Sequence, residues 1–148
     1  MLIYLDLCCF NRPFDDQAQA RIRLETEAKV AIQQHLRDGQ HQLVWSHILD
    51  FENSLNPFGD RRDSVSQWRR LAVRRISHDE QLVALARQLS QLGLKEYDAL
   101  HVAAAITGKV DLFVSTDDRL VRKLKGRDDI RCLLPGDALA LMEDWYED

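Results

Sequence analysis

The amino-acid sequence predicts an α/β protein: a three-layer sandwich with a mostly parallel sheet of about four or five strands and helices on both faces. One observation leads to this fold class, and a second one to the number of domains. Short apolar segments alternate along the chain with longer segments of helical period, which is typical of parallel strands joined by crossover helices. The 148 residues include only six glycines and three prolines, and no linker divides them. We therefore expect a single domain over residues 1–148.

The first half of the chain begins with a buried strand. Leu2–Leu5 is a short apolar run that ends at Asp6. Apolar residues at helical spacing then predict a long helix over Ala18–Arg37. A second strand, Gln42–Trp45, leads to Ser46, whose hydroxyl is a suitable N-cap for the helix that follows.

The second half of the chain has clear signals for the start and end of each element. The predicted elements are a helix over Asp60–Arg75, a helix from the Ser77–Glu80 capping box to Gly93, a helix over Lys95–Thr107, a strand over Asp111–Ser115, a helix capped by Thr116 that ends at Gly126, a strand over Ile130–Leu133, and a last helix from Pro135 to about Trp145.

Charge and cysteine content exclude several classes of protein. With 24 acidic and 20 basic residues, the chain lacks the excess of lysine and arginine on which non-specific nucleic-acid binding depends. Three cysteines without a CxxC spacing fit neither a zinc knuckle nor a disulfide framework. No apolar run is long enough for a membrane span, and the N-terminus does not resemble a signal peptide. A cytoplasmic location is therefore expected.

Four acidic residues are placed by the predicted topology near one edge of the sheet. Asp6 ends the first strand, Glu52 lies on the helix after the second, and Asp117 follows the next predicted strand. Sites in parallel sheets form outside the carboxyl ends of the strands, so these three residues belong together. Asp98, in the first turn of a helix, joins them if that helix points its N-terminus toward the same edge.

Clustered carboxylates favour a divalent cation. Without one they repel each other, whereas Mg²⁺ or Mn²⁺ takes oxygen ligands, acidifies a bound water and stabilises charge on a phosphoryl group. Taken singly, each acid also has a simpler interpretation as a helix cap or a surface charge. Asp6 is the exception, because an unpaired charge within the apolar segment of residues 2–10 would be costly.

Two further motifs resemble a known protein family. They are YDALHVAAA at residues 97–105 and FVSTDDRL at residues 113–120. Together with Asp6 after a short strand and Glu52 on the second βα unit, they are similar to the PIN domain. The resemblance covers roughly residues 1–134. It implies a Rossmann-like parallel sheet and a metal-dependent ribonuclease, and its opening segment is similar to a bacterial subgroup. Many bacterial members of the family are toxins of toxin–antitoxin pairs.

The resemblance also assigns roles to residues of this chain. Asp6, Glu52, Asp98 and Asp117 match the four acidic catalytic positions of the family. Asp6, Asp98 and Asp117 are the implied ligands of Mg²⁺ or Mn²⁺. Asp118, next to Asp117, is an alternative ligand.

Residues beside the acids complete the comparison. Ser115 matches the family's small hydroxyl residue, which orients a ligating carboxylate, and Thr116 beside it is a further supporting candidate. The chain departs from the family at Leu7, because the residue after the first aspartate is usually small or polar. The loss of a polar group there would weaken metal binding or mark a less active member.

An arginine-rich stretch and one histidine have two interpretations each. Six arginines between residues 61 and 75, with Trp68 among them, form either a surface that follows RNA phosphates or a solvated helix face with Trp68 in the core. His101 lies one turn from Asp98, so it either supports the site or is a hydrogen-bonded core histidine. The RNA-binding candidates are Arg61, Arg62, Arg69 and Arg70.

Three functions follow from these residues. The first is a ribonuclease that uses Mg²⁺ or Mn²⁺ and is the toxin of a toxin–antitoxin pair, with RNA as substrate, an antitoxin protein and a second copy of itself as partners, and no membrane association. The second is a non-catalytic PIN module that binds RNA or protein. The third, a phosphatase or phosphotransferase with Asp6 as nucleophile, is disfavoured because such enzymes usually carry a second aspartate where this chain has Cys8.

Overall fold

The computed structural model describes residues 1–146 and contains a five-stranded sheet with the strand order β3-β2-β1-β4-β5. Every neighbouring pair of strands is parallel. The predicted parallel α/β sandwich is therefore confirmed, and the last two residues of the predicted domain lie outside the described part. The strands are β1 (Leu2–Leu5), β2 (Gln42–Ser46), β3 (Ala72–Ile76), β4 (Leu112–Val114) and β5 (Cys132–Leu133).

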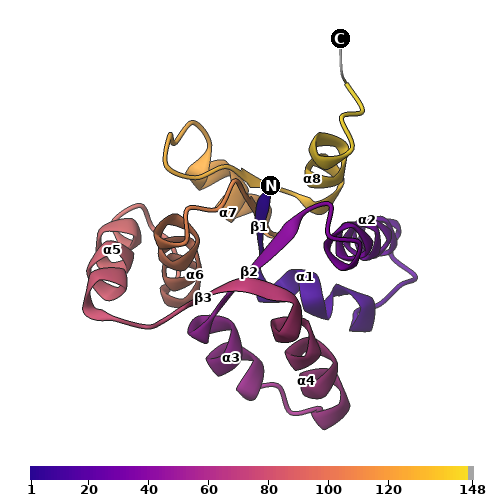
Figure 1. The fold of residues 1–148 in the computed structure, drawn as a ribbon, viewed down its shortest axis with the longest axis horizontal. Coiled ribbons are helices and arrows are strands. Elements are labelled where there is room, and N and C mark those ends of the chain that lie inside the picture. The colour runs from indigo at the N-terminus through magenta and orange to yellow at the C-terminus, as the bar shows by residue number, and fades with distance from the viewer. Residues whose placement is uncertain (147–148) are drawn as a thin grey trace.

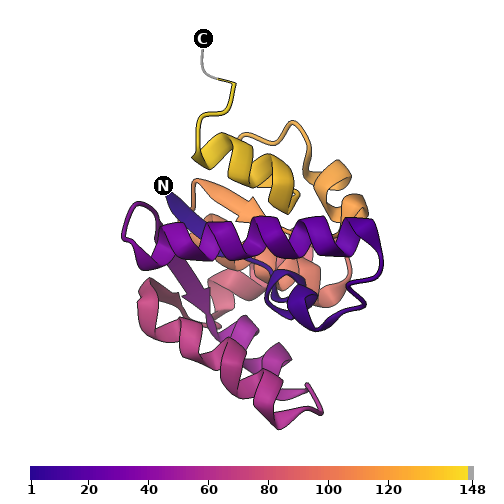
Figure 2. The ribbon, with the colours of Figure 1, turned by 90° about the vertical axis from the view of Figure 1, so that its right-hand side faces the viewer.

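Helices cover both faces of the sheet (Figure 1). The pair α5 and α6 lies on one face, and α2 and α8 pack together on the other (Figure 2). None of the helices within residues 1–146 is long and apolar enough to cross a membrane. The helices are α1 (Leu7–Asn11), the 3-10 turn η1 (Arg12–Phe14), α2 (Ala20–Arg37), α3 (His47–Ser54), α4 (Gly59–Ser66), the 3-10 turn η2 (Gln67–Leu71), α5 (Glu80–Ser90), α6 (Glu96–Thr107), α7 (Asp118–Leu124) and α8 (Pro135–Met142).

The central strand β1 explains the position of Asp6. Ile3, Tyr4 and Leu5 are completely buried, because β1 has a strand on each side and helices on both faces. Leu5 pairs with Val114 of β4, and the Asp6 N–H donates to the Val114 carbonyl at 2.9 Å. Asp6 therefore leaves the sheet beside the end of β4, at the carboxyl edge predicted to hold the site.

The helix predicted over Asp60–Arg75 is wrong in its second half. The chain forms α4, the turn η2 and then β3, which pairs in parallel with β2 at the edge of the sheet. Three successive residues of β3, Val73, Arg74 and Arg75, are exposed. An edge strand exposed in this way has no apolar alternation, so the sequence pattern did not reveal it.

Two predicted helix caps move by one or two residues. Asp79, and not Ser77, caps α5 by accepting from the Leu82 N–H at 2.9 Å. Asp117, and not Thr116, caps α7 by accepting from the Arg119 N–H at 2.9 Å. In each case an aspartate closer to the first turn takes the position, since its carboxylate also interacts favourably with the helix dipole.

Candidate metal centre

Asp6 is the most enclosed carboxylate of the site. Only 5% of its surface is exposed. It caps the first turn of α1, where its Oδ1 accepts from the Leu7 N–H at 2.8 Å. Its Oδ2 accepts from the Ser115 hydroxyl at 3.0 Å, and the Cys8 thiol lies 3.5 Å from the same oxygen. These donors offset the cost of burying the charge and fix the direction of the carboxylate.

A chain of buried hydrogen bonds connects the sheet to Glu52. The Tyr4 hydroxyl lies 2.6 Å from both Ser46 Oγ and His101 Nδ1. The other ring nitrogen, His101 Nε2, lies 3.1 Å from Glu52 Oε1 and 3.8 Å from Asp6 Oδ1. The chain thus runs from β2 through β1 and α6 to α3, and it holds Glu52 beside Asp6.

His101 is a hydrogen-bonded histidine of the core and also supports the carboxylates of the site. The two interpretations predicted for it therefore both apply. It is 1% exposed and has a partner at each ring nitrogen. Burial alone would lower the pKa of His101, but the hydrogen bond to Glu52 and the charges of Asp6, Glu52 and Asp98 together raise it. A carboxylate accepts hydrogen bonds, so Nε2 acts as the donor to Glu52 and is engaged within the protein.

Asp98 lies in the first turn of α6 and is half-buried. Burial, and after it the negative charges of Asp6 and Asp117, raise the pKa of Asp98 to about 6, although His101 and Lys95 oppose the shift. His101, one turn further along α6, has its Nε2 3.8 Å from Asp6 Oδ1, so the N-terminal half of α6 lies at the carboxyl edge, as the grouping of Asp98 with the other acids requires. A cation placed among these acids would remove the repulsion.

Asp117 and Asp118 have different partners. Asp118 forms a bidentate pair with Arg21 at 2.6 and 2.9 Å, so its charge is neutralised within the protein. The Asp117 carboxylate accepts only from the backbone N–H groups of Arg119 and Leu120 among residues 1–146. Of the two neighbouring acids, Asp117 is therefore the one whose charge is left for an ion.

The predicted supporting residues have separate contacts. The Ser115 hydroxyl donates to Asp6 and accepts from the Asp117 N–H at 3.1 Å, so it joins two of the acids. Thr116 uses its backbone: its N–H donates to Cys8 Sγ at 3.4 Å, and its carbonyl accepts from Arg21. The Leu7 side chain is buried in the core. The polar contact beside Asp6 is made by Cys8, one residue later.

Sequence reasoning missed Tyr4 and Ser46 as parts of the site. The only available signal was the placement of polar groups in otherwise apolar strands. A buried hydroxyl needs a partner, and here the partner is His101. The spacing of His101 to Asp98 indicated the shared helix face but not the contact with Glu52, which lies on another helix.

Several arginines of residues 61–75 are engaged within the protein. Arg61 stacks on Phe58 at 4.1 Å from the ring centre, and Arg62 donates to the Asn56 carbonyl. Arg69 pairs with Asp50 at 3.3 Å, and Arg74 donates to the Gly108 carbonyl at 2.8 Å. Trp68 is buried as expected of a core residue.

The donor set fits a hard divalent cation. Asp6, Glu52 and His101 each present an atom within 4.8 Å of the others, and His101 is occupied by Glu52. The remaining ligand atoms of this group are the carboxylate oxygens of Asp6 and Glu52. Oxygen ligands suit Mg²⁺ or Mn²⁺ better than Zn²⁺.

A parallel sheet with acidic residues gathered at its carboxyl edge defines the class of protein, and comparison with known proteins gives the family. The model of the PIN domain family matches residues 3–126, so the chain belongs to this family. No curated protein matches the sequence. The fold is similar to that in the crystal structure of VapBC2 from Rickettsia felis bound to a DNA fragment from their promoter, with a TM-score of 0.51 and 14% identity over 90% of this chain and 98% of that chain.

Proposed function

We propose that this protein is a ribonuclease that hydrolyses RNA phosphodiester bonds with the help of Mg²⁺ or Mn²⁺. The observation that carries the proposal is geometric: atoms of Asp6, Glu52 and His101 lie within 4.8 Å of one another at the carboxyl edge of the sheet. Burial, and after it the charges of Asp6 and Asp117, also raise the pKa of the half-buried Asp98. Such a concentration of negative charge is costly without a cation. Membership of the PIN family supports the same chemistry.

The acidic residues would hold the ion, and their neighbours would keep them in position. Asp6, Asp98 and Asp117 would hold the ion, and Glu52 would complete the cluster. When bound, the ion would activate a water for attack on the phosphodiester and stabilise charge on the phosphoryl oxygens. Ser115 and the Leu7 N–H keep Asp6 in place, and His101 keeps Glu52 beside it. Because these groups are already ordered, little reorganisation would accompany binding.

The proposal extends to the biological setting. The similar solved structure is VapBC2 from Rickettsia felis in complex with promoter DNA. By analogy, this chain would be the toxin of a toxin–antitoxin pair in the cytoplasm, with an antitoxin protein as partner and RNA as target. Formation of a homodimer is part of the same proposal.

The decisive experiment compares Asp98→Asn with a matched control, Asp60→Asn. Both residues are acids in the first turn of a helix, but Asp60 is exposed on α4 away from the cluster. With purified protein and total RNA, wild type and Asp60→Asn should cleave with Mn²⁺ and not with EDTA, whereas Asp98→Asn should not cleave.

Calorimetry separates the remaining functions. Absence of saturable Mn²⁺ binding by the wild type would indicate a non-catalytic module whose acids no longer hold an ion. Full cleavage by Asp98→Asn, or cleavage by the wild type in EDTA, would contradict the proposed site. A phosphorylated Asp6 after incubation with a phosphate donor would instead support the phosphotransferase.

A further inference from the structure

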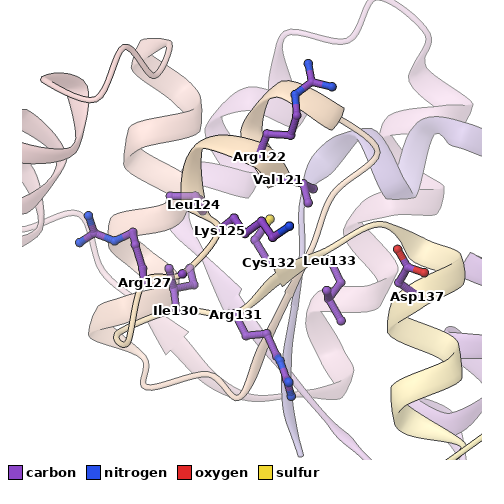
Figure 3. Close-up of a pocket in the computed structure, with 11 residues that line it drawn as sticks. Val121, Arg122, Leu124, Lys125, Arg127, Ile130, Arg131, Cys132, Leu133 and Asp137 are labelled. Carbon is purple, nitrogen blue, oxygen red and sulfur yellow. The ribbon is translucent and has the colours of Figure 1, made fainter. Parts of the chain in front are cut away.

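Two hollows lie on either side of α7, and they share one residue, Arg122. The first has a volume of about 530 Å³ and opens directly beside the acidic site, since Asp117 and Thr116 line it together with Lys95 and Arg119. The second has a volume of about 640 Å³ and lies between α7 and β5 (Figure 3). The two hollows therefore form a path that begins at the acidic site and continues past α7.

Part of the path is lined by cations that form no salt bridge. Arg12, Arg21 and Arg127, which also line it, each have a carboxylate partner. Within residues 1–146, no salt bridge is formed by five further cations, all of them exposed. These five are Lys95, Arg119, Arg122, Lys125 and Arg131. We refer to them as the α7 track.

The spacing of the α7 track suits a polyanion. Arg119 and Arg122 lie three residues apart on α7, about 4.5 Å apart in rise, and Lys125 follows at the C-cap of the helix. In Figure 3, the side chains of Arg122 and Arg131 project from opposite sides of the second hollow, and Lys125 lies between them. Apolar residues, Val121 and Ile130 among them, also line this hollow and would lie beside sugars or bases.

Other cationic regions fit this role less well. Arg61, Arg62, Arg69 and Arg74 are engaged by aromatic rings, carbonyls or Asp50. The α7 track begins at the cluster of acids. The protein as a whole has a net charge of −4, which does not attract RNA. Attraction of an RNA strand thus has to come from a local concentration of cations.

We propose that the α7 track binds the phosphates of a single-stranded RNA and guides the strand from the acidic site across α7 into the hollow beside β5. The inference rests on the proposed nuclease function and adds the course of the substrate. Lys125 and Arg131 would contact phosphates several nucleotides away from the bond that is cut.

The test measures binding of a labelled single-stranded RNA of about 20 nucleotides by fluorescence anisotropy in EDTA, where cleavage does not occur. Three double variants carry the same change in charge. They are Lys125→Gln/Arg131→Gln in the track, Arg69→Gln/Arg70→Gln in the competing region, and Arg23→Gln/Arg87→Gln as a control on exposed positions of α2 and α5.

We expect a specific loss for the track variant. For a single strand, each lost phosphate contact reduces the magnitude of the slope of log K against log salt concentration by about 0.7. Two lost contacts reduce it by about 1.4, which weakens RNA binding about 25-fold at about 0.1 M salt. The control variant should bind like the wild type. Equal losses in all three variants, or a loss confined to Arg69→Gln/Arg70→Gln, would overturn the inference.

Cleavage and a protein probe separate the inference from the proposed function. If the wild type cleaves RNA and the track variant binds and cleaves equally well, the track is wrong and the nuclease stands. If the track variant alone loses binding but the wild type never cleaves, the track stands and the nuclease is wrong. Absence of RNA binding by the wild type, or tighter binding of a polyglutamate peptide than of RNA, would overturn the track.

Discussion

The Tyr4 hydroxyl shows how a single buried atom organises the site. It joins Ser46 Oγ and His101 Nδ1, and the Tyr4 ring stacks on Phe113 with 5.2 Å between ring centres. Burial raises the pKa of Tyr4 well above its usual value, so the phenol stays protonated and can donate. The hydroxyl therefore aligns the imidazole that holds Glu52.

Removing this hydroxyl tests the alignment. Tyr4→Phe should cost about 1–3 kcal/mol of unfolding free energy, because buried Ser46 and His101 atoms lose a partner. It should also lower Mn²⁺-dependent cleavage by about 10- to 100-fold, as expected when a group that orients a ligand is lost. Urea denaturation and cleavage assays measure the two effects, with the exposed Tyr146→Phe as control. Unchanged cleavage in Tyr4→Phe would show that the chain of hydrogen bonds is not needed.

Lys29 is a buried charge outside the site. It lies on the inner face of α2, forms no salt bridge within residues 1–146, and its Nζ lies 6.0 Å from the centre of the Phe10 ring. Burial lowers the pKa of Lys29 to about 8; interaction with Cys9 opposes this shift, and Arg37 adds to it. The charged form therefore destabilises the folded state at neutral pH.

Lys29→Met should thus stabilise the protein at pH 7, by at most about 3 kcal/mol, since one pKa unit corresponds to 1.36 kcal/mol. The folded state loses the Lys29 proton at a lower pH than the unfolded chain does. The cost is thus complete below pH 8 and decreases above it. The stability difference between variant and wild type should accordingly shrink from pH 7 to pH 9 in urea titrations. A constant difference, or a stabilisation equal to that of exposed Lys109→Met, would contradict the assignment.

Helix α6 carries both Asp98 and His101, so its position determines the geometry of the site. Its C-cap, Gly108, lies where the end of α6 approaches the sheet. A Cβ at this residue would meet Ile76 Cδ1 at 3.1 Å and Val44 Cγ1 at 3.2 Å. Only glycine allows the end of α6 to pack this closely on β2 and β3.

A pair of alanine substitutions tests this packing. Gly108→Ala should destabilise the protein by about 1–3 kcal/mol, as overpacking of a core does. Gly136→Ala, in the first turn of α8 with open space around it, should be neutral or stabilise by up to about 1 kcal/mol. Thermal and urea unfolding compare the two. Equal effects at both positions would mean that α6 shifts without cost.

For the whole molecule, a bound cation should act as a stabilising ligand. The folded state brings Asp6 and Glu52 together, and in the proposed site Asp98 and Asp117 join them, whereas the unfolded chain separates all four. A ligand that binds only the folded state at a hundred times its Kd adds about 2.7 kcal/mol of stability. Mn²⁺ should therefore raise the Tm of the wild type and of Asp60→Asn but not that of Asp98→Asn. A similar rise in all three would place the ion elsewhere.

The strand and helix pattern was predictable to different degrees along the chain. Leu2–Leu5 and the helices around Ala20–Arg37 and Glu96–Thr107 follow from local apolar patterns. The edge strand Ala72–Ile76 does not, because it is held by pairing with β2 and not by an apolar face. Caps moved by one or two residues for a related reason: neighbouring polar residues compete for the same N–H groups, and the backbone direction decides between them.

The amino-acid sequence alone was enough to predict the parallel α/β class, because apolar periodicity is a local property. It also gave the candidates Asp6, Glu52, Asp98 and Asp117, because their places at the ends of strands or in helices next to them, and the motifs around them, can be read locally. The choice of Asp117 over Asp118, the connection from Ser46 through Tyr4 and His101 to Glu52, and the track of unpaired cations along α7 depend on contacts between distant segments. Hydrogen bonds and ion pairs act over a few ångströms in space, so only the packed structure could decide which charges are neutralised and which remain for an ion or a phosphate.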